Sequence, residues 1–386
     1  MIKLLARLFI KHHNDTADPD VRRAYGTLCG AVGIALNLFL SLGKFLAGVL
    51  SGSIAVTADA FNNLLDAASS LITLVGFRLA GQKADPDHPF GHGRMEYISG
   101  FLVSVLTLLT MIELAKSSFA KILSPRQVHI TLPVLLFLLL SVAVKGYMSL
   151  YNARLGKKLN APAMKATAVD SLSDMLATAV VLCSALIVRF FGVPVDGWCG
   201  LIVCLFIGYA GLDAAKGALG PLLGQAPDRE FVQQVYDITL SQKEILGVHD
   251  LIVHSYGPDS TLISLHAEVP ADGDLITLHE VIDHTEHLLR DKLHCHAVIH
   301  MDPVRVGDEE TERFKALVLR CAEEIDPSLT IHDFRIVPCQ GGWRLFFDLA
   351  APYGFAMSDA KLRDALTQRL NREDASLIPE IEIDRE

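Results

Sequence analysis

Residues 54–79 read IAVTADAFNNLLDAASSLITLVGFRL, an apolar run of membrane-spanning length that nevertheless contains Asn62 and Asp66. A second apolar run, Met164–Phe191, contains Asp170 and Asp174. The members of each pair are four residues apart, so on a helix both side chains project from one face. Carboxylates at bilayer depth are costly and usually mark an ion path or a proton relay. The two runs predict a membrane protein that handles cations.

The chain has 386 residues, of which 51% are hydrophobic and 20% are charged. Apolar residues are concentrated before about residue 224 and charged residues after it, which predicts a membrane domain followed by a soluble one. A spanning helix needs roughly 20 mostly apolar residues. Six runs meet this requirement: Tyr25–Leu50, Ile54–Leu79, Tyr97–Leu123, Leu132–Leu155, Met164–Phe191 and Gly197–Leu219.

Lys and Arg predict the orientation of these spans, because cytoplasmic loops carry an excess of both. The N-terminus and the linkers after the second and fourth runs are basic, whereas the first linker has no basic residue. Lys121 and Arg126 in the third linker weaken the contrast. We expect a multi-pass plasma-membrane protein with both termini in the cytoplasm. Residues 1–24 are expected to form a cytoplasmic amphipathic segment, with an interfacial helix over Met1–His13.

Beyond Leu223 the pattern indicates a small α+β domain in the order αββαβ. The same order recurs after residue 307, and GVHDLIV at 247–253 is echoed by TIHDFRI at 330–336. A period of about 83 residues predicts a duplicated domain. The expected elements are Glu230–Lys243, Leu251–Val253, Thr261–Val269, Thr277–Leu293 and Ala297–Met301, then Thr311–Ile325, Ile331–Val337, Arg344–Ala350, Ser358–Asn371 and Ile378–Ile383.

Asn62, Asp66, Asp170 and Asp174 form an all-oxygen set, which suits hard cations such as Mn²⁺, Mg²⁺ and Ca²⁺. Asn62 taken alone also fits a hydrogen bond between helices. Asp59, one turn before Asn62, fits a proton relay and a structural role equally well. Ligands must lose their protons to bind metal, so protons arriving at these carboxylates would expel a bound cation. This competition is a physical basis for exchange of metal for protons.

A second candidate lies in the linker after the second run, where Asp85, His88 and His92 have the spacing D-x-x-H-x-x-x-H. Imidazole and carboxylate at this spacing can close around one metal ion. Pro86, Pro89 and the glycines around His92 favour a fixed loop over a helix. The alternative is that these side chains are solvated loop residues.

The segments ADAFNNLLD at 58–66 and DPDHPFGHGR at 85–94 resemble signatures of the cation diffusion facilitator family. The Asp170 and Asp174 pair and IHMDP at 299–303 are also similar to that family. The resemblance implies a homodimer of six-helix subunits that exports divalent transition metals against proton influx. It implies a ferredoxin-like cytoplasmic domain at 224–306, following a membrane domain at 25–223. Zinc-preferring members often have His at position 62 or 170, so the Asn-Asp-Asp-Asp set resembles the bacterial manganese-exporting branch.

The resemblance also places cytoplasmic metal ligands at His249, His266, His279, His300 and Asp302; the alternative is a set of surface histidines. Arg94 matches a residue that some members join to an acidic side chain beyond the sixth helix. That place holds Gly224 here, so either Asp228 substitutes or the interlock is absent. Residues 307–386 lie beyond the usual family end and are expected to be a second, degenerate ferredoxin-like repeat. In it His249, His266, His300 and Asp302 correspond to His332, Asp348, Glu382 and Asp384, and we expect no metal there.

The sequence therefore predicts proton-coupled efflux of a divalent metal, with Mn²⁺ favoured over Zn²⁺, Fe²⁺, Co²⁺ and Cd²⁺. We expect a secondary antiporter and not an enzyme, because no HExxH, GxSxG or comparable motif occurs. A membrane-anchored metal sensor is the alternative of a different class. Divalent metals are the only expected cofactors, and no organic cofactor is expected. The acidic soluble part, in a chain of net charge -10, argues against a nucleic-acid partner.

Overall fold

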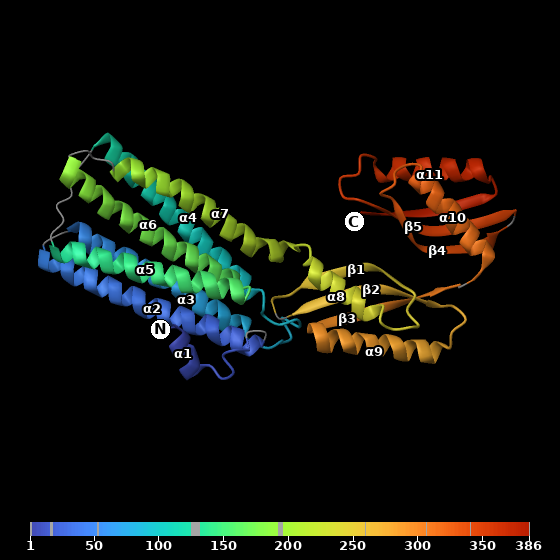
Figure 1. The fold of residues 1–386 in the computed structure, drawn as a ribbon, viewed down its shortest axis with the longest axis horizontal. Helices are drawn as coiled ribbons and strands as arrows, with labels where there is room; N and C mark the ends of the chain where they lie inside the picture. Colours follow the sequence, from blue (N-terminus) through green and yellow to red (C-terminus); the bar gives the residue numbers. More distant parts are fainter. Residues whose placement is uncertain are drawn as a thin grey trace. The chain divides into compact units, whose positions relative to one another are not determined.

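The structure is a computed structural model that describes residues 2–15, 18–51, 54–124, 132–191, 196–258, 260–305, 307–339 and 341–385. The chain folds as two compact units. The first comprises Met1–Ala226 together with the hairpin segment His254–Thr261. The second comprises Pro227–Val253 and Leu262–Glu386. Figure 1 shows the first unit as a helical bundle and the second as two groups of strands and helices.

The first unit contains a short helix followed by six long ones. Each long helix coincides with one predicted run, although most begin or end several residues outside it. Their bounds are α1 (Ile2–Phe9), α2 (Pro19–Ser51), α3 (Ile54–Ala80), α4 (Met95–Leu123), α5 (Leu132–Lys158), α6 (Pro162–Phe191) and α7 (Asp196–Leu223).

Four of these helices are long and apolar enough to cross a membrane, over Pro19–Leu46, Met95–Leu123, Leu135–Lys158 and Gly197–Leu223. Within the described residues α3 and α6 are not among them. Both are long, at 27 and 30 residues, and both contain charged side chains. In α6 these include Lys165, Asp170 and Asp174.

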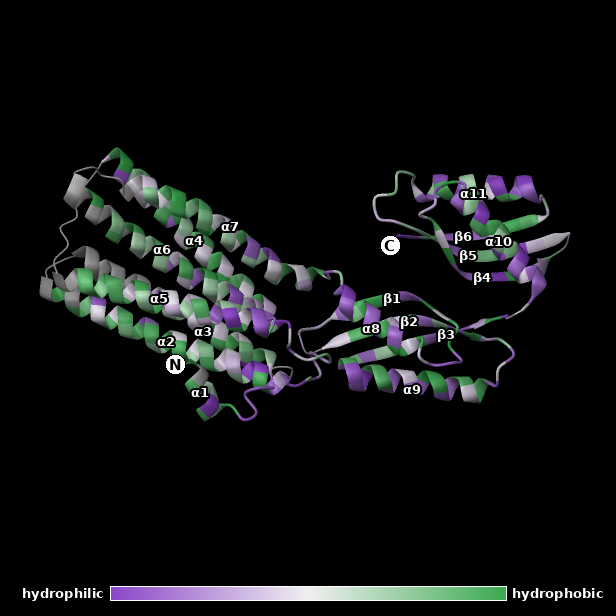
Figure 2. Cartoon of the chain, viewed as in Figure 1, coloured by the Kyte–Doolittle hydropathy of each residue, from purple (hydrophilic) through white to green (hydrophobic). Residues whose placement is uncertain are grey.

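Polarity in the bundle is the reverse of that in a water-soluble protein. Large apolar side chains are exposed along the outer helices, as at Phe39, Leu205 and Tyr209, and apolar residues dominate α2, α4, α5 and α7 (Figure 2). Polar side chains are buried between the helices, among them Asn37, Ser104 and Asn152. An apolar exterior around a polar interior fits a bundle whose outer face contacts lipid.

Helix α1 buries one face and exposes the other. Ile2, Ala6 and Ile10 are buried in a cluster that includes residues of α2, α5 and α6. Leu8 and Phe9 are each 74% exposed on the outer face. The outer face of this short helix is therefore apolar and exposed, and its contact with the membrane interface stays a prediction.

The second unit has two halves with the same element order, helix–strand–strand–helix–strand. The first half forms a sheet in the order β1-β2-β3, and the second a sheet in the order β4-β5-β6. Strand β4 runs antiparallel to β5, and β6 runs parallel to β5. The bounds are α8 (Arg229–Thr239), β1 (Gly247–Ser255), β2 (Thr261–Pro270), α9 (Leu275–Leu293), β3 (Cys295–Val304), α10 (Glu309–Glu323), β4 (Thr330–Cys339), β5 (Gly342–Ala351), α11 (Asp359–Glu373) and β6 (Leu377–Arg385).

Each half has its own apolar core between helices and sheet. Ile263, Leu265 and Leu289 are fully buried in the first core, and Leu345, Leu349 and Leu366 in the second. Asp274 and Asp308 cap α9 and α10 by accepting backbone N–H groups of the first turn. Two separate cores allow each half to hold its strands, and the ligand-type side chains on them, in fixed positions.

Strand β1 starts four residues before its predicted first residue. Asp250, inside this strand, has a left-handed backbone with φ 51°. Asp333 has φ 47° at the equivalent place in β4, directly after His332. In β4 the pairing register also shifts between His332 and Arg335. Such irregularities break the alternation that identifies a strand in a sequence, although β4 has the same irregularity and begins within one residue of its predicted start.

Candidate metal centres

Acidic side chains of α3 and α6 lie inside the helical bundle. Asp66 of α3 and Asp170 of α6 are 8% and 6% exposed. Asp174 lies one turn after Asp170, and its side chain is 24% exposed. Thr107 of α4 donates a hydrogen bond from Oγ1 to Asp170 Oδ1 at 3.0 Å. Three helices therefore contribute to one polar region.

Lys145 of α5 lies between two of these carboxylates. Its ammonium nitrogen is 2.7 Å from Asp66 Oδ2 and 2.6 Å from Asp174 Oδ2. The Lys145 side chain is only 2% exposed, so its charge is shielded by these partners and not by water. Carboxylates on α3 and α6 thus reach the same cation, as a metal site would require.

Not every predicted member of this site can be placed. The side chains of Asp59 and Asn62 on α3 lie outside the described residues. The neighbouring Asn63 is described, and its Oδ1 accepts a hydrogen bond from Lys44 Nζ of α2 at 3.2 Å. The single positive charge of Lys145 would not balance Asp66, Asp170 and Asp174 if all three carboxylates lost their protons. The arrangement favours a cation of higher charge than one ammonium.

The three predicted loop residues come together. His88 Nδ1 is 3.3 Å from Asp85 Oδ1, and His92 Nε2 is 3.5 Å from Asp85 Oδ2. The two rings lie 4.4 Å apart between centroids. Hydrogen bonds, chiefly from the His88 backbone N–H, lower the pKa of Asp85 and keep it ionised. His92 Nδ1 is buried and makes no hydrogen bond to any of the described residues. This donor set fits a divalent metal such as Zn²⁺ or Mn²⁺.

Arg94 contacts the hairpin segment that belongs to the first unit. Its Nε and one terminal nitrogen donate to the Ser255 carbonyl at 3.2 and 2.9 Å. The guanidinium also lies over the Tyr256 ring, 4.6 Å from its centroid. Asp228, the predicted acidic partner, instead accepts a hydrogen bond from the backbone N–H of Glu230 at the start of α8.

Two glycines allow the loop and the hairpin to meet. A Cβ on Gly93 would lie 2.8 Å from the Tyr256 carbonyl oxygen and 3.0 Å from Gly257 Cα. Gly257 has φ +141°, a conformation that other residues rarely adopt. The glycine after His92 is therefore required for backbone contact as well as for the shape of the loop.

Four of the five predicted cytoplasmic ligands come together on the first sheet. His266 Nδ1 is 2.9 Å from Asp302 Oδ2, and His249 Nε2 is 3.3 Å from the same oxygen. His300 Nε2 lies 3.2 Å from Asp302 Oδ1. His249 Nε2 is buried and makes no hydrogen bond in the described part of the chain. One carboxylate surrounded by three imidazoles fits a Zn²⁺, Mn²⁺ or Fe²⁺ site.

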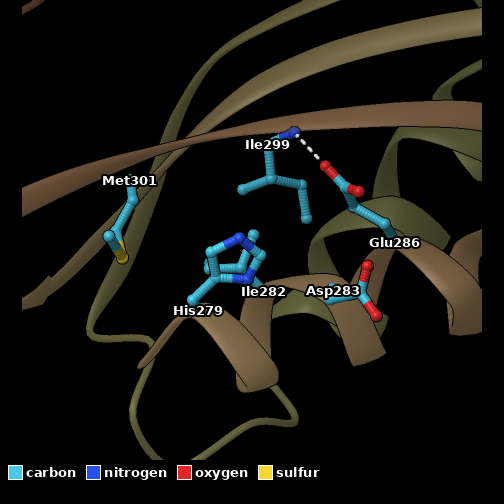
Figure 3. Close-up of a pocket in the computed structure, with 6 residues that line it drawn as sticks. All are labelled: His279, Ile282, Asp283, Glu286, Ile299 and Met301. Atoms are coloured by element: carbon cyan, nitrogen blue, oxygen red, sulfur yellow. Dashed lines mark hydrogen bonds between the residues drawn. The ribbon is translucent and has the colours of Figure 1, made fainter. Parts of the chain in front are cut away.

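The fifth predicted ligand, His279, lies elsewhere. It lines a cavity of about 250 Å³ between α9 and β3. Figure 3 shows its ring facing this cavity, with Met301 on the strand opposite. Glu286, in the same wall, accepts the backbone N–H of Ile299 at 2.8 Å. The described residues thus place His279 apart from the His249 cluster.

Two residues of these clusters, Lys145 and Asp250, were not among the predicted site residues. Lys145 was detectable, because a lysine within the fourth apolar run is as conspicuous as the aspartates. Asp250 contacts His249 at 3.2 Å and His266 at 3.8 Å. In the sequence, Asp250 is distinguished only by the His-Asp dipeptide at 249–250, which recurs at 332–333.

Comparison with known proteins identifies both units. The family model described as the cation efflux transmembrane domain matches residues 31–223. The model described as the cytoplasmic domain of cation efflux proteins, named ZT_dimer, matches residues 227–304. The second half of the second unit lies outside both matches.

Relatives align over most of their own length. An uncharacterized transporter, MJ0449, of Methanocaldococcus jannaschii is 30% identical over 64% of this chain and 86% of its own. The magnetosome protein MamB of a Magnetospira species is 26% identical over 62% and 81%. The cation-efflux pump FieF of Citrobacter koseri is 25% identical over 76% and 99%. The chain therefore belongs to the cation efflux family, the cation diffusion facilitators.

Proposed function

We propose that this protein exports a divalent transition metal, bound within the membrane by Asn62, Asp66, Asp170 and Asp174. Members of the family are transporters rather than enzymes. The observation that carries the proposal is that Asp66 and Asp174, from different helices, hold one buried cation, the Lys145 ammonium. Oxygens that converge on an ammonium can converge on a metal ion. The relative named as a cation-efflux pump supports export as the direction.

The Lys145 ammonium competes with a metal ion for the carboxylate oxygens of Asp66 and Asp174. A divalent cation that takes the same oxygens must displace the ammonium, and the ammonium must return when the cation leaves. This exchange avoids a state in which several buried carboxylates face each other without a cation, which would be strongly unfavourable. Lys145 thus favours release of the metal as well as stability of the metal-free protein.

Mn²⁺ is the proposed substrate, because oxygen ligands suit it and no imidazole or thiolate belongs to the set. Zn²⁺, Fe²⁺, Co²⁺ and Cd²⁺ are the alternatives within the same class. Proton coupling follows from the chemistry of the ligands, since carboxylates bind metal only when deprotonated. Protons entering from the far side would replace the metal, which makes the protein an antiporter. Asp59 is a candidate relay for these protons.

The wider assembly is also part of the proposal. The name of the matched cytoplasmic domain suggests dimerization, and we propose a homodimer in the plasma membrane. All six long helices would span the bilayer, with both termini in the cytoplasm. The charged side chains of α3 and α6 are consistent with this where they face the bundle interior, as the buried Asp66 and Asp170 do.

The loop and cytoplasmic clusters are proposed as accessory metal sites. Asp85, His88 and His92 form one, and His249, His266, His300 and Asp302 form the other. We also propose that residues 307–386 are a second copy of the cytoplasmic domain. Support comes from the shared element order and from the left-handed Asp that follows His249 in one half and His332 in the other.

Metal flux into proteoliposomes tests the proposal. Purified full-length protein should move Mn²⁺ when a pH difference is imposed, and Asp66→Asn should reduce the flux to that of empty vesicles. Asp213→Asn is the matched control, because Asp213 lies exposed on α7 away from the cluster. Flux in Asp66→Asn equal to that of wild type would refute the site, and flux indifferent to pH would refute the coupling.

A further inference from the structure

A second cluster of ligand-type side chains joins the two halves of the second unit. It consists of Asp250 from β1 and, from the other half, His332 of β4, Asp348 of β5 and Asp384 of β6. One donor atom from each of the four lies within 4.8 Å of the other three. Ligands around a small divalent cation are roughly 3 to 4.5 Å apart, given metal–ligand distances near 2.1 Å. The cluster is therefore close to the size that a metal requires.

The sheet of the second half brings three of these residues together. His332 pairs directly with Asp348 across β4 and β5. Asp384 pairs with Ala350 across β5 and β6, two residues along β5 from Asp348. His332 Nδ1 is 3.8 Å from Asp348 Oδ2, and His332 Nε2 is 3.3 Å from Asp384 Oδ2. The imidazole thus lies between two carboxylates from neighbouring strands.

Asp250 completes the cluster from the first half. Its Oδ1 is 3.9 Å from His332 Nε2. The His249 and His332 rings also lie 5.0 Å apart between centroids. The left-handed backbone at Asp250 interrupts β1 at this point, so the contact between the halves falls at the irregularity of the strand.

The cluster has an excess of negative charge. In the described part of the chain no Lys or Arg forms an ion pair with Asp250, Asp348 or Asp384. Arg385, the neighbour of Asp384 in sequence, pairs instead with Asp359. Burial and the nearby Asp384 raise the pKa of Asp348 to about 6, and burial and Asp250 raise the pKa of Asp384. His249 and His266 also contact Asp250, but without a Lys or Arg partner among the described residues the three carboxylates favour a bound cation.

We propose that Asp250, His332, Asp348 and Asp384 bind a divalent metal ion that ties the two halves of the second unit together. Three carboxylate oxygens and one imidazole nitrogen suit Mn²⁺, Fe²⁺ or Zn²⁺. This proposal departs from the expectation, drawn from the sequence, that the second half binds no metal. The second half has Asp348 and Glu382 where the first half has His266 and His300. Asp250 of the first half supplies a further carboxylate to the cluster.

The site would share the His249-Asp250 dipeptide with the neighbouring cluster of His249, His266 and Asp302. Metals in both places would form a pair of centres connected through adjacent residues of β1. The second half then acts as a ligand donor to the first within the same chain. It also gives residues 307–386, which no matched family domain covers, a defined role in cytoplasmic metal binding.

Counting bound Mn²⁺ tests the proposal. Metal-stripped full-length protein in detergent is titrated with Mn²⁺, and free Mn²⁺ is measured from its electron paramagnetic resonance signal. Asp348→Asn/Asp384→Asn should bind one Mn²⁺ fewer per chain than wild type. Glu380→Gln is the matched control, because Glu380 is an exposed carboxylate of the same strand, β6, outside the cluster, and it should bind the wild-type number.

Asp250→Asn provides an independent variant from the other half. Asn tolerates the left-handed backbone that Asp250 adopts, so the fold should be retained while the bridging ligand is lost. Loss of one Mn²⁺ in this variant as well supports a site that both halves build. Wild-type numbers of bound Mn²⁺ in either folded variant would overturn the proposal, whatever the transport assay shows.

Discussion

The two acidic clusters of this molecule neutralise their charge in opposite ways. In the membrane bundle Asp66 and Asp174 hold Lys145, a cation that belongs to the protein. Between the two halves of the second unit, Asp250, Asp348 and Asp384 contact imidazoles but no Lys or Arg among the described residues. A site with its own cation can release a metal without leaving buried charges exposed to one another. A site without one should retain its metal, and the contrast separates transport from structural binding.

The largest expected difference between the clusters is in transport. Asp174→Asn removes a carboxylate of the proposed transport site, and we expect Mn²⁺ flux to fall at least about 100-fold, since even outer-shell changes cost 10–100-fold in affinity. Asp384→Asn changes the other cluster and should affect flux far less. Parallel flux assays in proteoliposomes decide this. Equal losses of Mn²⁺ flux in the two variants would mean that the clusters do not differ in their role in transport.

Removing the Lys145 ammonium should make the thermal stability of the bundle depend on bound metal. Lys145→Met leaves two buried carboxylates without their partner, a change that typically costs about 3–5 kcal/mol. We expect a lower melting temperature in the metal-free variant, restored by added Mn²⁺, together with tighter Mn²⁺ binding. Thermal unfolding with and without Mn²⁺ measures this. Lys165→Met, which alters an exposed lysine of α6, should behave like wild type in both conditions.

Selectivity provides a smaller effect that sharpens the contrast in ligand chemistry. The membrane set contains only oxygen donors, whereas the cytoplasmic clusters contain imidazole. Asp170→His introduces a nitrogen donor beside Asp174, and we expect the ratio of Zn²⁺ to Mn²⁺ transport to rise. Competition between the two metals in one flux assay gives this ratio. An unchanged ratio would mean that groups outside the ligand set determine selectivity.

The smallest effect concerns pH and the cluster between the halves. Because the folded pKa of Asp348, about 6, exceeds that of an unfolded aspartate, the folded state binds more protons. Stability of the metal-free protein should therefore fall as pH rises from about 4 to 6. Asp348→Asn should flatten this dependence. Melting curves across that pH range, in the presence of a chelator, provide the check, and a rise in stability with pH in both proteins would contradict it.

The sequence was informative where a residue conflicts with its surroundings. Asp66, Asp170 and Asp174 are conspicuous because they interrupt apolar runs, and the four-residue spacing of Asp170 and Asp174 places both on one helix face. Lys145 interrupts an apolar run in the same way. It was not predicted because a lysine ammonium is not a metal ligand. The loop residues Asp85, His88 and His92 are close in sequence, so their proximity in space required little tertiary information.

Other features depend on tertiary structure and could not be read from the pattern. Asp250 and Asp384 are far apart in the chain and meet only because the two halves pack together. His279 has the residue type of a ligand, but its position on α9 directs it to a separate cavity. Arg94 donates to the backbone carbonyl of Ser255. Every residue has such a carbonyl, so the side-chain types in the sequence do not indicate this partner.

The central claim is that a metal takes the place of the Lys145 ammonium between Asp66 and Asp174. Anomalous diffraction at the manganese edge, from crystals of full-length protein grown with Mn²⁺, tests it most directly. The account predicts a manganese peak in contact with both carboxylates, with the Lys145 nitrogen moved away from them. A protein that transports Mn²⁺ yet shows no peak there, with Lys145 still bound to both carboxylates, would contradict it.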